Sequence, residues 1–188
     1  MKKALRSSRV AADQPIEIWF QDEARVGQKG SLEYIWAPIG SRPPAVRDIR
    51  HDSVYLFGAL CAERERGAAV VMPGVSGDAM SEHLKVISAA IAPGAHAIVV
   101  CDGAGWHQRG GKLKVPDNMT LLSLPPYSPE LNPMENVWDY LRGNKLSHRV
   151  WDTYEAIVDA CVDAWNFLTR DKQRIRSIAA RKWACVNH

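Results

Sequence analysis

Three acidic residues, Asp22, Asp102 and Glu135, stand where their side chains could meet. Asp22 directly follows a run of β-branched and aromatic residues, and Asp102 directly follows the most apolar run of the chain; both runs are typical of strands. Glu135 lies one turn into a helix that Asn132 and Pro133 are expected to open as cap and first helical residue. If the two strands are neighbours in one sheet, both aspartates emerge at the same edge, and Glu135 can point along that edge toward them.

Carboxylates that converge in this way repel one another strongly unless cations hold them together, so convergence would imply a metal site. Ligand sets made only of oxygen select hard ions, Mg²⁺ or Mn²⁺, over zinc. Two such ions can activate an attacking oxygen and stabilise the leaving oxygen of a phosphodiester, mostly by stabilising charge. The sequence contains no Ser-His-Asp or Cys-His arrangement and no phosphate-binding glycine loop that would indicate another chemistry.

Each of these carboxylates also has a purely structural explanation. An aspartate after a strand is a common turn residue, and Asp102 with Gly103 is a favourable turn pair. Glu135, at the third helical position, could fold back onto the backbone amide of Asn132 as a capping box. Spacing alone therefore leaves metal catalysis and local structure open as alternatives.

The elements that must position these residues follow from the periodicity of the sequence. Three early strands, a helix, two more strands and then helices predict a mixed α/β sheet with helices on both faces. Residues 1–15 are polar, basic and aperiodic, and they are interpreted as a lead or a linker remnant. The predicted strands are 16–21, 54–61, 68–72, 97–101 and 119–124, with a short one at 34–37, and the predicted helices are 78–91, one opened at 132–133, one begun by Asp152 and Glu155, and 172–183.

The segment LPPYSPELNPMENVWDYLR (residues 124–142) resembles the signature of the mariner-like superfamily of DDE transposases, especially its bacterial insertion-sequence branch. The segments WFQDEAR, IVVCDGAGWH and YIWAPIGSRP also resemble that family. The resemblance implies that Asp22, Asp102 and Glu135 are the first, second and third ligands of two Mg²⁺ or Mn²⁺ ions. It also implies an RNase H-like catalytic domain over residues 16–188.

The activity implied by the resemblance is cleavage of double-stranded DNA at transposon ends and strand transfer into a target that contains TA. Pairing two ends implies at least a homodimer in the reaction complex. Family members normally carry an N-terminal helix-turn-helix region, and the residues before Ile16 are too few to form one. We therefore expect a fragment, a second reading frame joined to the first by frameshifting, or a decayed copy. An inactive remnant that binds DNA or a partner, and a general RNase H-like nuclease, remain alternatives.

Four further residues are candidates for contact with DNA. Arg25 and Arg142 flank the predicted site, His107 follows Asp102 by five positions, and Tyr127 lies in the proline-rich loop before Glu135. Each also has a structural explanation, as surface charge, satisfied histidine or packed ring.

The charge distribution suits a protein that holds a polyanion while placing carboxylates near it. Residues 1–13 carry four basic residues and one acidic residue (+3), residues 14–141 carry 11 and 15 (−4), and residues 142–188 carry nine and five (+4). Solvated helix faces explain the same pattern.

No apolar run reaches the length of about 20 residues that spans a bilayer, and no secretory signal is present, so a cytoplasmic, nucleoid-associated location is expected. The cysteines, at positions 61, 101, 161 and 185, lack metal-site spacing and are interpreted as buried thiols.

Overall fold

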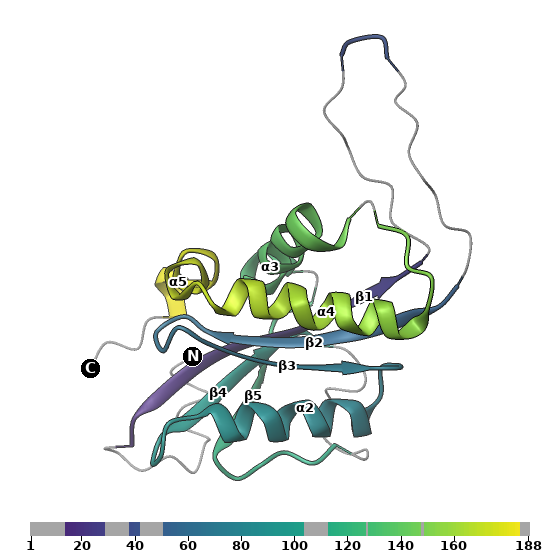
Figure 1. Cartoon of the computed structure of the whole chain (residues 1–188). Helices are drawn as coiled ribbons and strands as arrows, with labels where there is room; N and C mark the ends of the chain where they lie inside the picture. Colours follow the sequence, from purple (N-terminus) through teal and green to yellow (C-terminus); the bar gives the residue numbers. More distant parts are fainter. Residues whose placement is uncertain are drawn as a thin grey trace.

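The fold is built on one five-stranded sheet with the strand order β3-β2-β1-β4-β5, shown in a computed structural model (Figure 1). The structure describes residues 14–28, 38–41, 51–103, 113–126, 128–147 and 149–184. The short strand predicted at 34–37 lies outside these residues, as does most of the predicted N-terminal lead. The strands are β1 (Ile16–Gly27), β2 (Ser53–Cys61), β3 (Arg66–Met72), β4 (His96–Cys101) and β5 (Met119–Ser123).

Strand β1 is the centre of the sheet and the element on which the site depends. It pairs with β4 in parallel, with Phe20 opposite Val100, and with β2 in antiparallel orientation, with Asp22 opposite Gly58. Strand β4 pairs in parallel with β5, and β2 forms a hairpin with β3. All six residues of β4 are buried, as expected for a strand covered on both faces.

The prediction that the first strand ends before Asp22 is wrong. Strand β1 continues to Gly27, because residues 22–27 keep pairing with β2 after the pairing with β4 has ended. Ala24 and Val26 are buried in this extension and continue the alternation of the strand. Asp22 therefore lies within the central strand, in a more rigid position than a turn would give it.

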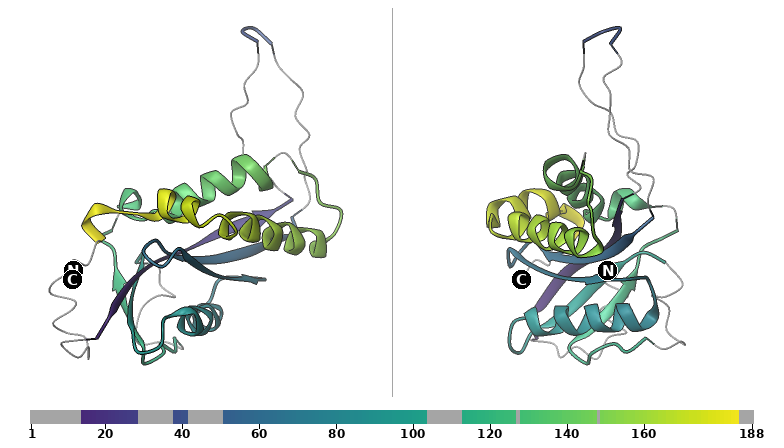
Figure 2. Two further views of the ribbon diagram at one scale, coloured as in Figure 1. Left: turned by 60° about the vertical axis from the view of Figure 1, so that its left-hand side comes forward. Right: turned by 45° about the vertical axis from the view of Figure 1, so that its right-hand side comes forward.

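Helices cover both faces of the sheet, as predicted (Figures 1 and 2). Helix α2 (Gly77–Ala90) packs on one face, and its residues Met80, Leu84 and Ile87 are buried there with Trp19 of β1. The opposite face is covered by α3 (Met134–Leu141), α4 (Tyr154–Thr169) and α5 (Lys172–Ala179). No helix of the described part of the chain is both long and apolar enough to cross a membrane.

Two of the predicted helix boundaries are corrected by the structure. The fourth helix is capped by Thr153, whose side chain accepts a hydrogen bond from the amide of Ala156, and Asp152 lies outside it. The basic segment 172–183 is two elements, because α5 ends where Ala180 adopts an extended conformation. Three short elements also lie in the described part of the chain: η2 (Pro129–Leu131), η3 (Arg142–Leu146, a π-helical turn) and η4 (Lys182–Ala184).

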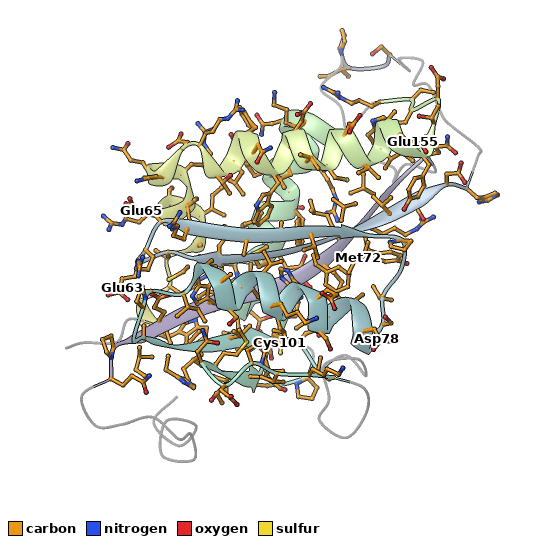
Figure 3. The ribbon with its side chains drawn as sticks, turned by 60° about the horizontal axis from the view of Figure 1, so that its bottom comes forward. Glu63, Glu65, Met72, Asp78, Cys101 and Glu155 are labelled. Atoms are coloured by element: carbon orange, nitrogen blue, oxygen red, sulfur yellow. The ribbon has the colours of Figure 1, made fainter. Side chains whose placement is uncertain are left out.

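The buried side chain of Glu17 ties the N-terminal end of β1 to the rest of the fold. Glu17 accepts hydrogen bonds from the indole of Trp19, the guanidinium of Arg64 and the amide of Ala92. This places the β2–β3 turn against the N-terminal end of β1, and Figure 3 shows that turn, with Glu63 and Glu65, at the opposite end of the sheet from Met72 and Asp78. Three of the four cysteines are buried free thiols, as predicted; Cys185 lies outside the described residues.

Gly58 in β2 makes room for two tryptophan rings on the face of the sheet that α3, α4 and α5 cover. A Cβ atom at this position would lie 2.8 Å from the ring of Trp138 in α3 and 2.7 Å from the ring of Trp165 in α4. The two rings also contact each other, with centroids 6.5 Å apart. Only a residue without a side chain therefore lets both helices approach β2 at this point.

We expect Gly58→Ala to lower the free energy of unfolding by about 1–3 kcal/mol, because the added methyl group overpacks a filled site. Urea denaturation measures this change. Gly74→Ala is the matched control, since a Cβ atom there meets nothing within 4 Å. Equal stability of the two variants would show that the rings move aside at no cost.

Candidate active site

Asp22 lies on the face of the central strand that α3, α4 and α5 cover, directly beneath α3. Its neighbours on that face are Phe20 and Ala24, both part of the hydrophobic core. The indole Nε1 of Trp138 donates a hydrogen bond of 2.8 Å to Oδ2 of Asp22. The ring of Trp138 is buried. The sequence did not predict this bond, because helical periodicity indicates which rings are buried but not where a single donor points.

The pKa of Asp22 is raised from 3.8 to about 7. Burial is the largest cause, since it removes the carboxylate from water, and the negative charges of Glu23 and Glu135 add to it. The Trp138 hydrogen bond and a backbone hydrogen bond from Glu23 act in the opposite direction and do not cancel the effect of burial. Asp22 is thus a carboxylate whose charge the surrounding protein compensates only in part.

Asp102 follows β4 directly, as predicted, and it is exposed. The parallel pairing matches Phe20 with Val100, so two further residues along each strand lead to Asp22 and Asp102. Backbones of neighbouring strands lie about 4.8 Å apart. The two aspartates therefore lie at the same edge of the sheet. The adjacent Cys101 thiol has a pKa raised to about 12, first by burial and then by the charges of Asp102 and Glu23.

Glu135 is exposed in the first turn of α3. The helix starts at Met134 with Pro133 as its cap, one residue later than predicted. The backbone amide of Asn132 donates to the carbonyl oxygen of Pro129 at 2.9 Å, so it is already occupied by a bond other than the alternative capping box with Glu135.

The side chain of Asn132 ties the start of α3 to the central strand. It donates a buried hydrogen bond of 3.0 Å to the carbonyl oxygen of Gln21, and its own oxygen accepts from the amide of Met134 at 3.2 Å. This bond fixes the beginning of α3 at the residue next to Asp22. Sequence reasoning recognised Asn132 as a cap but not as a link to the strand.

Strand register relates Asp102 to Asp22, and the charge of Glu135 acts on Asp22, but the three carboxylates do not form a closed cluster. Across the described ranges, from residue 14 to 184 with their gaps, no three His, Cys, Asp or Glu side chains are grouped so that they could hold a metal ion. The chemistry of the donor set still fits a hard divalent cation, because all three candidates offer carboxylate oxygens. The charge of Glu135 acts on Asp22, which places these two within electrostatic reach.

The structure separates the secondary candidates. Arg25 is exposed and donates from Nε to Ser53 Oγ at 3.1 Å, and strand alternation turns it to the opposite face from Asp22, so it does not flank that carboxylate. Arg142 follows α3 and forms an ion pair of 3.4 Å with Asp139. His107 and Tyr127 lie outside the described residues. Glu23, which adjoins Asp22, accepts a hydrogen bond from Gln21 at 3.2 Å.

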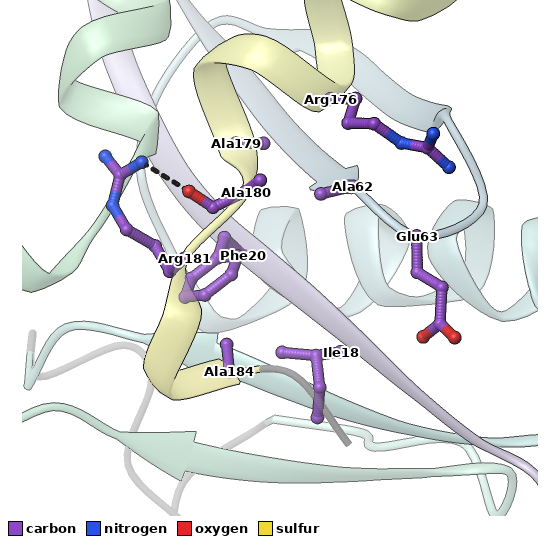
Figure 4. Close-up of a pocket in the computed structure, with 9 residues that line it drawn as sticks. All are labelled: Ile18, Phe20, Ala62, Glu63, Arg176, Ala179, Ala180, Arg181 and Ala184. Carbon is purple, nitrogen blue, oxygen red and sulfur yellow. Dashed lines mark hydrogen bonds between the residues drawn. The ribbon is translucent and has the colours of Figure 1, made fainter. Parts of the chain in front are cut away.

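A separate pocket of about 260 Å³ opens between the N-terminal half of β1 and the C-terminal segment (Figure 4). Ile18 and Phe20 form its floor, and the small side chains of Ala179 and Ala184 leave the space above them unfilled. None of the three carboxylates lines this pocket.

A mixed sheet of this order, with helices on both faces and acidic residues at one edge, defines an RNase H-like fold. A family model described as DDE superfamily endonuclease matches residues 17–158, most of the chain. The chain therefore belongs to the DDE superfamily of endonucleases. A protein of Sinorhizobium fredii (strain NBRC 101917 / NGR234), the uncharacterized protein y4pE/y4sA, is 50% identical over 130 residues, which are 69% of this chain and 96% of that protein.

Solved structures of Mos1 show the same fold. The Mos1 mariner paired end complex with Mn matches with a TM-score of 0.63 at 18% identity, over 86% of this chain and 51% of the Mos1 chain. The Mos1 strand transfer complex matches with a TM-score of 0.60 at 18% identity, over 86% of this chain and 50% of that one. The chain thus spans about half the length of the Mos1 chains. The family model thus confirms the DDE superfamily that the sequence resemblance implied, and the Mos1 structures confirm the RNase H-like fold.

The raised pKa of Asp22 gives a prediction for the protein without metal. Between pH 4 and 7 the unfolded chain loses the Asp22 proton while the folded chain keeps it, so folding becomes less favourable as pH rises. Asp22→Asn removes this dependence. We compare the free energy of unfolding of the wild type with that of Asp22→Asn, both in EDTA. As pH rises through this range, the wild-type value should fall relative to the variant by at most about 1.4 kcal/mol per pH unit. Above the range, the difference between the two should stay constant.

Urea denaturation at a series of pH values measures the difference. Asp139→Asn is the control, because Asp139 is an exposed carboxylate of α3 (side chain 78% accessible) and its variant should follow the wild type. A difference between the wild type and Asp22→Asn that does not change with pH would contradict the assigned environment of Asp22.

Proposed function

We propose that this chain is the catalytic domain of a DNA transposase, in which Asp22, Asp102 and Glu135 hold two Mg²⁺ or Mn²⁺ ions. The reaction is phosphodiester cleavage at transposon ends, followed by attack of the freed 3′-hydroxyl on target DNA. Membership of the DDE superfamily supports the class of reaction, and the positions of the three carboxylates support their roles.

The observation that carries the proposal is the position of Asp22. A partly buried carboxylate whose charge is not fully compensated destabilises the fold, and groups of this kind gather at functional sites. The strand register brings Asp102 to the same edge, and α3 brings the charge of Glu135 near Asp22. A purely structural aspartate at this position would sit beside a cation of the protein, as Glu17 sits beside Arg64.

Divalent cations at this site would activate the attacking oxygen and stabilise charge on the leaving oxygen of the phosphodiester. The protein's part is to supply ligands from rigid elements. Asp22 is fixed within the central strand and Glu135 on a helix anchored by Asn132. Asp102 is exposed directly after the last residue of β4, so the end of that strand positions it.

Double-stranded DNA is the proposed substrate, as transposon ends and as target. The related structures are named as a Mos1 paired end complex and a Mos1 strand transfer complex, and by analogy two copies of this chain would act together on paired ends. An N-terminal helix-turn-helix portion, encoded with the chain or separately, would supply recognition of the ends.

Asp102→Asn and Glu135→Gln should each abolish Mg²⁺- or Mn²⁺-dependent cleavage while leaving the fold intact, because each removes a charged metal ligand from an exposed position. A supercoiled plasmid carrying the cognate ends measures cleavage, and circular dichroism measures folding. The control is Asp117→Asn, an exposed carboxylate before the start of β5. This variant should cleave at the wild-type rate.

Three outcomes would reject parts of this proposal. Full cleavage by either ligand variant would remove that residue from the site. A folded wild type that neither cleaves nor joins DNA with Mn²⁺ would favour the inactive remnant, and cleavage without strand-transfer products would favour a general nuclease.

We expect this chain to bind DNA weakly and without sequence preference, with an affinity that falls as salt rises. Each phosphate contact contributes about 0.9 to the slope of log K against log salt, so Arg142→Ala should reduce the slope by about one. Lys85→Ala, on α2 at the opposite face, should not change it. Fluorescence anisotropy between 50 and 200 mM NaCl measures both, and equal slopes would exclude a phosphate contact at Arg142.

A further inference from the structure

We propose that Trp138 is a positioning residue of the metal site, because its indole N–H holds the Asp22 carboxylate in the orientation that binds the cation. The inference rests on the proposed function. Its basis is the hydrogen bond of 2.8 Å from Trp138 Nε1 to Asp22 Oδ2, which joins α3 to the central strand on the face of the sheet that α3, α4 and α5 cover.

The ring of Trp138 is held so that its single donor has one direction. An indole carries one N–H and no acceptor, so its orientation decides what it can bind. The side chain is only 2% exposed, and it is confined by the surface at Gly58 and by the ring of Trp165. Gly58 is also the residue paired with Asp22 across β1 and β2, so the space that admits the ring lies directly beside the carboxylate.

Two hydrogen bonds place α3 relative to the strand. Asn132 binds the carbonyl oxygen of Gln21, and Trp138 binds the carboxylate of the next residue, Asp22. Glu135 lies between these two contacts along the chain. The pair of bonds therefore sets the position of the helix that carries one proposed ligand relative to the strand that carries another.

Asp22 depends on the hydrogen bond from Trp138 for its orientation more than Glu17 depends on the hydrogen bond from Trp19. Trp19 donates a hydrogen bond of 2.9 Å to Glu17, but Glu17 also binds the Arg64 guanidinium at 2.7 Å and the amide of Ala92 at 3.0 Å. Trp138 is the one side chain recorded as a hydrogen-bond donor to Asp22 among the described residues. A carboxylate accepts several hydrogen bonds, so the donors from Trp138 and from the backbone of Glu23 leave capacity for a cation.

The test measures Mn²⁺ affinity of the whole chain without DNA, by electron paramagnetic resonance. Trp138→Phe removes the donor and keeps a ring, and replacement of Trp138 by 3-benzothienylalanine removes only the N–H while preserving shape. Both should weaken Mn²⁺ binding by about tenfold to a hundredfold, the effect of losing a group that orients a ligand. Trp19→Phe, which removes the indole N–H that Glu17 accepts on the same strand, should stay within about twofold of the wild type.

Thermal unfolding of each variant separates a positioning role from a structural one. If Trp138→Phe is too unstable to measure, the benzothienyl variant decides alone. Wild-type Mn²⁺ affinity in the benzothienyl variant, with Asp22→Asn impaired, would overturn the positioning role and leave the proposed function standing. Absence of Mn²⁺ binding by the wild type, or an unchanged affinity in Asp22→Asn, would overturn the proposed function and this inference with it.

Discussion

A carboxylate within the apolar face of the central strand constrains much of this structure. Asp22 stands between Phe20 and Ala24 on a surface that otherwise buries hydrocarbon. Removing an ionised carboxylate from water is unfavourable unless hydrogen bonds or opposite charge replace the lost hydration. Here the replacement is incomplete, and the pKa of Asp22 rises to about 7. Cation binding would compensate the remaining charge. The unfavourable burial of the Asp22 carboxylate and the binding of a cation would therefore be coupled.

The elements around Asp22 follow from this constraint. A helix must cross the strand closely enough to deliver an N–H to the carboxylate, and close approach requires a flat surface on the neighbouring strand. Gly58 supplies that surface at the residue paired with Asp22. Asn132 then fixes the start of the helix through the backbone of Gln21. Met134, Val137 and Leu141 bury the helix against the sheet, so its polar contacts are made on a well-packed base.

Periodicity was sufficient to predict the strands of the sheet and the helices that cover it, because burial repeats along the sequence in a regular way. It failed where pairing between distant segments decides the outcome. The extension of β1 past Asp22 depends on β2, which begins 31 residues later, at Ser53. The bond from Trp138 to Asp22 spans 116 positions, and no local pattern carries it. An isolated glycine in an otherwise apolar strand, Gly58, was the available signal that another element approaches closely.

Strand β1 carries three buried or partly buried carboxylates, Glu17, Asp22 and Glu23, and the surroundings of the first two explain why Asp22 is suited to chemistry and Glu17 is not. Glu17 is 4% exposed and is bound by an arginine, an indole and a backbone amide. Its charge is compensated within the protein, so a cation would have to displace Arg64. Asp22 accepts hydrogen bonds from the indole of Trp138 and from the backbone, and the negative charges of Glu23 and Glu135 act on it. A site for hard cations needs negative charge that the fold holds in place without neutralising it, and on this strand Asp22 meets that condition.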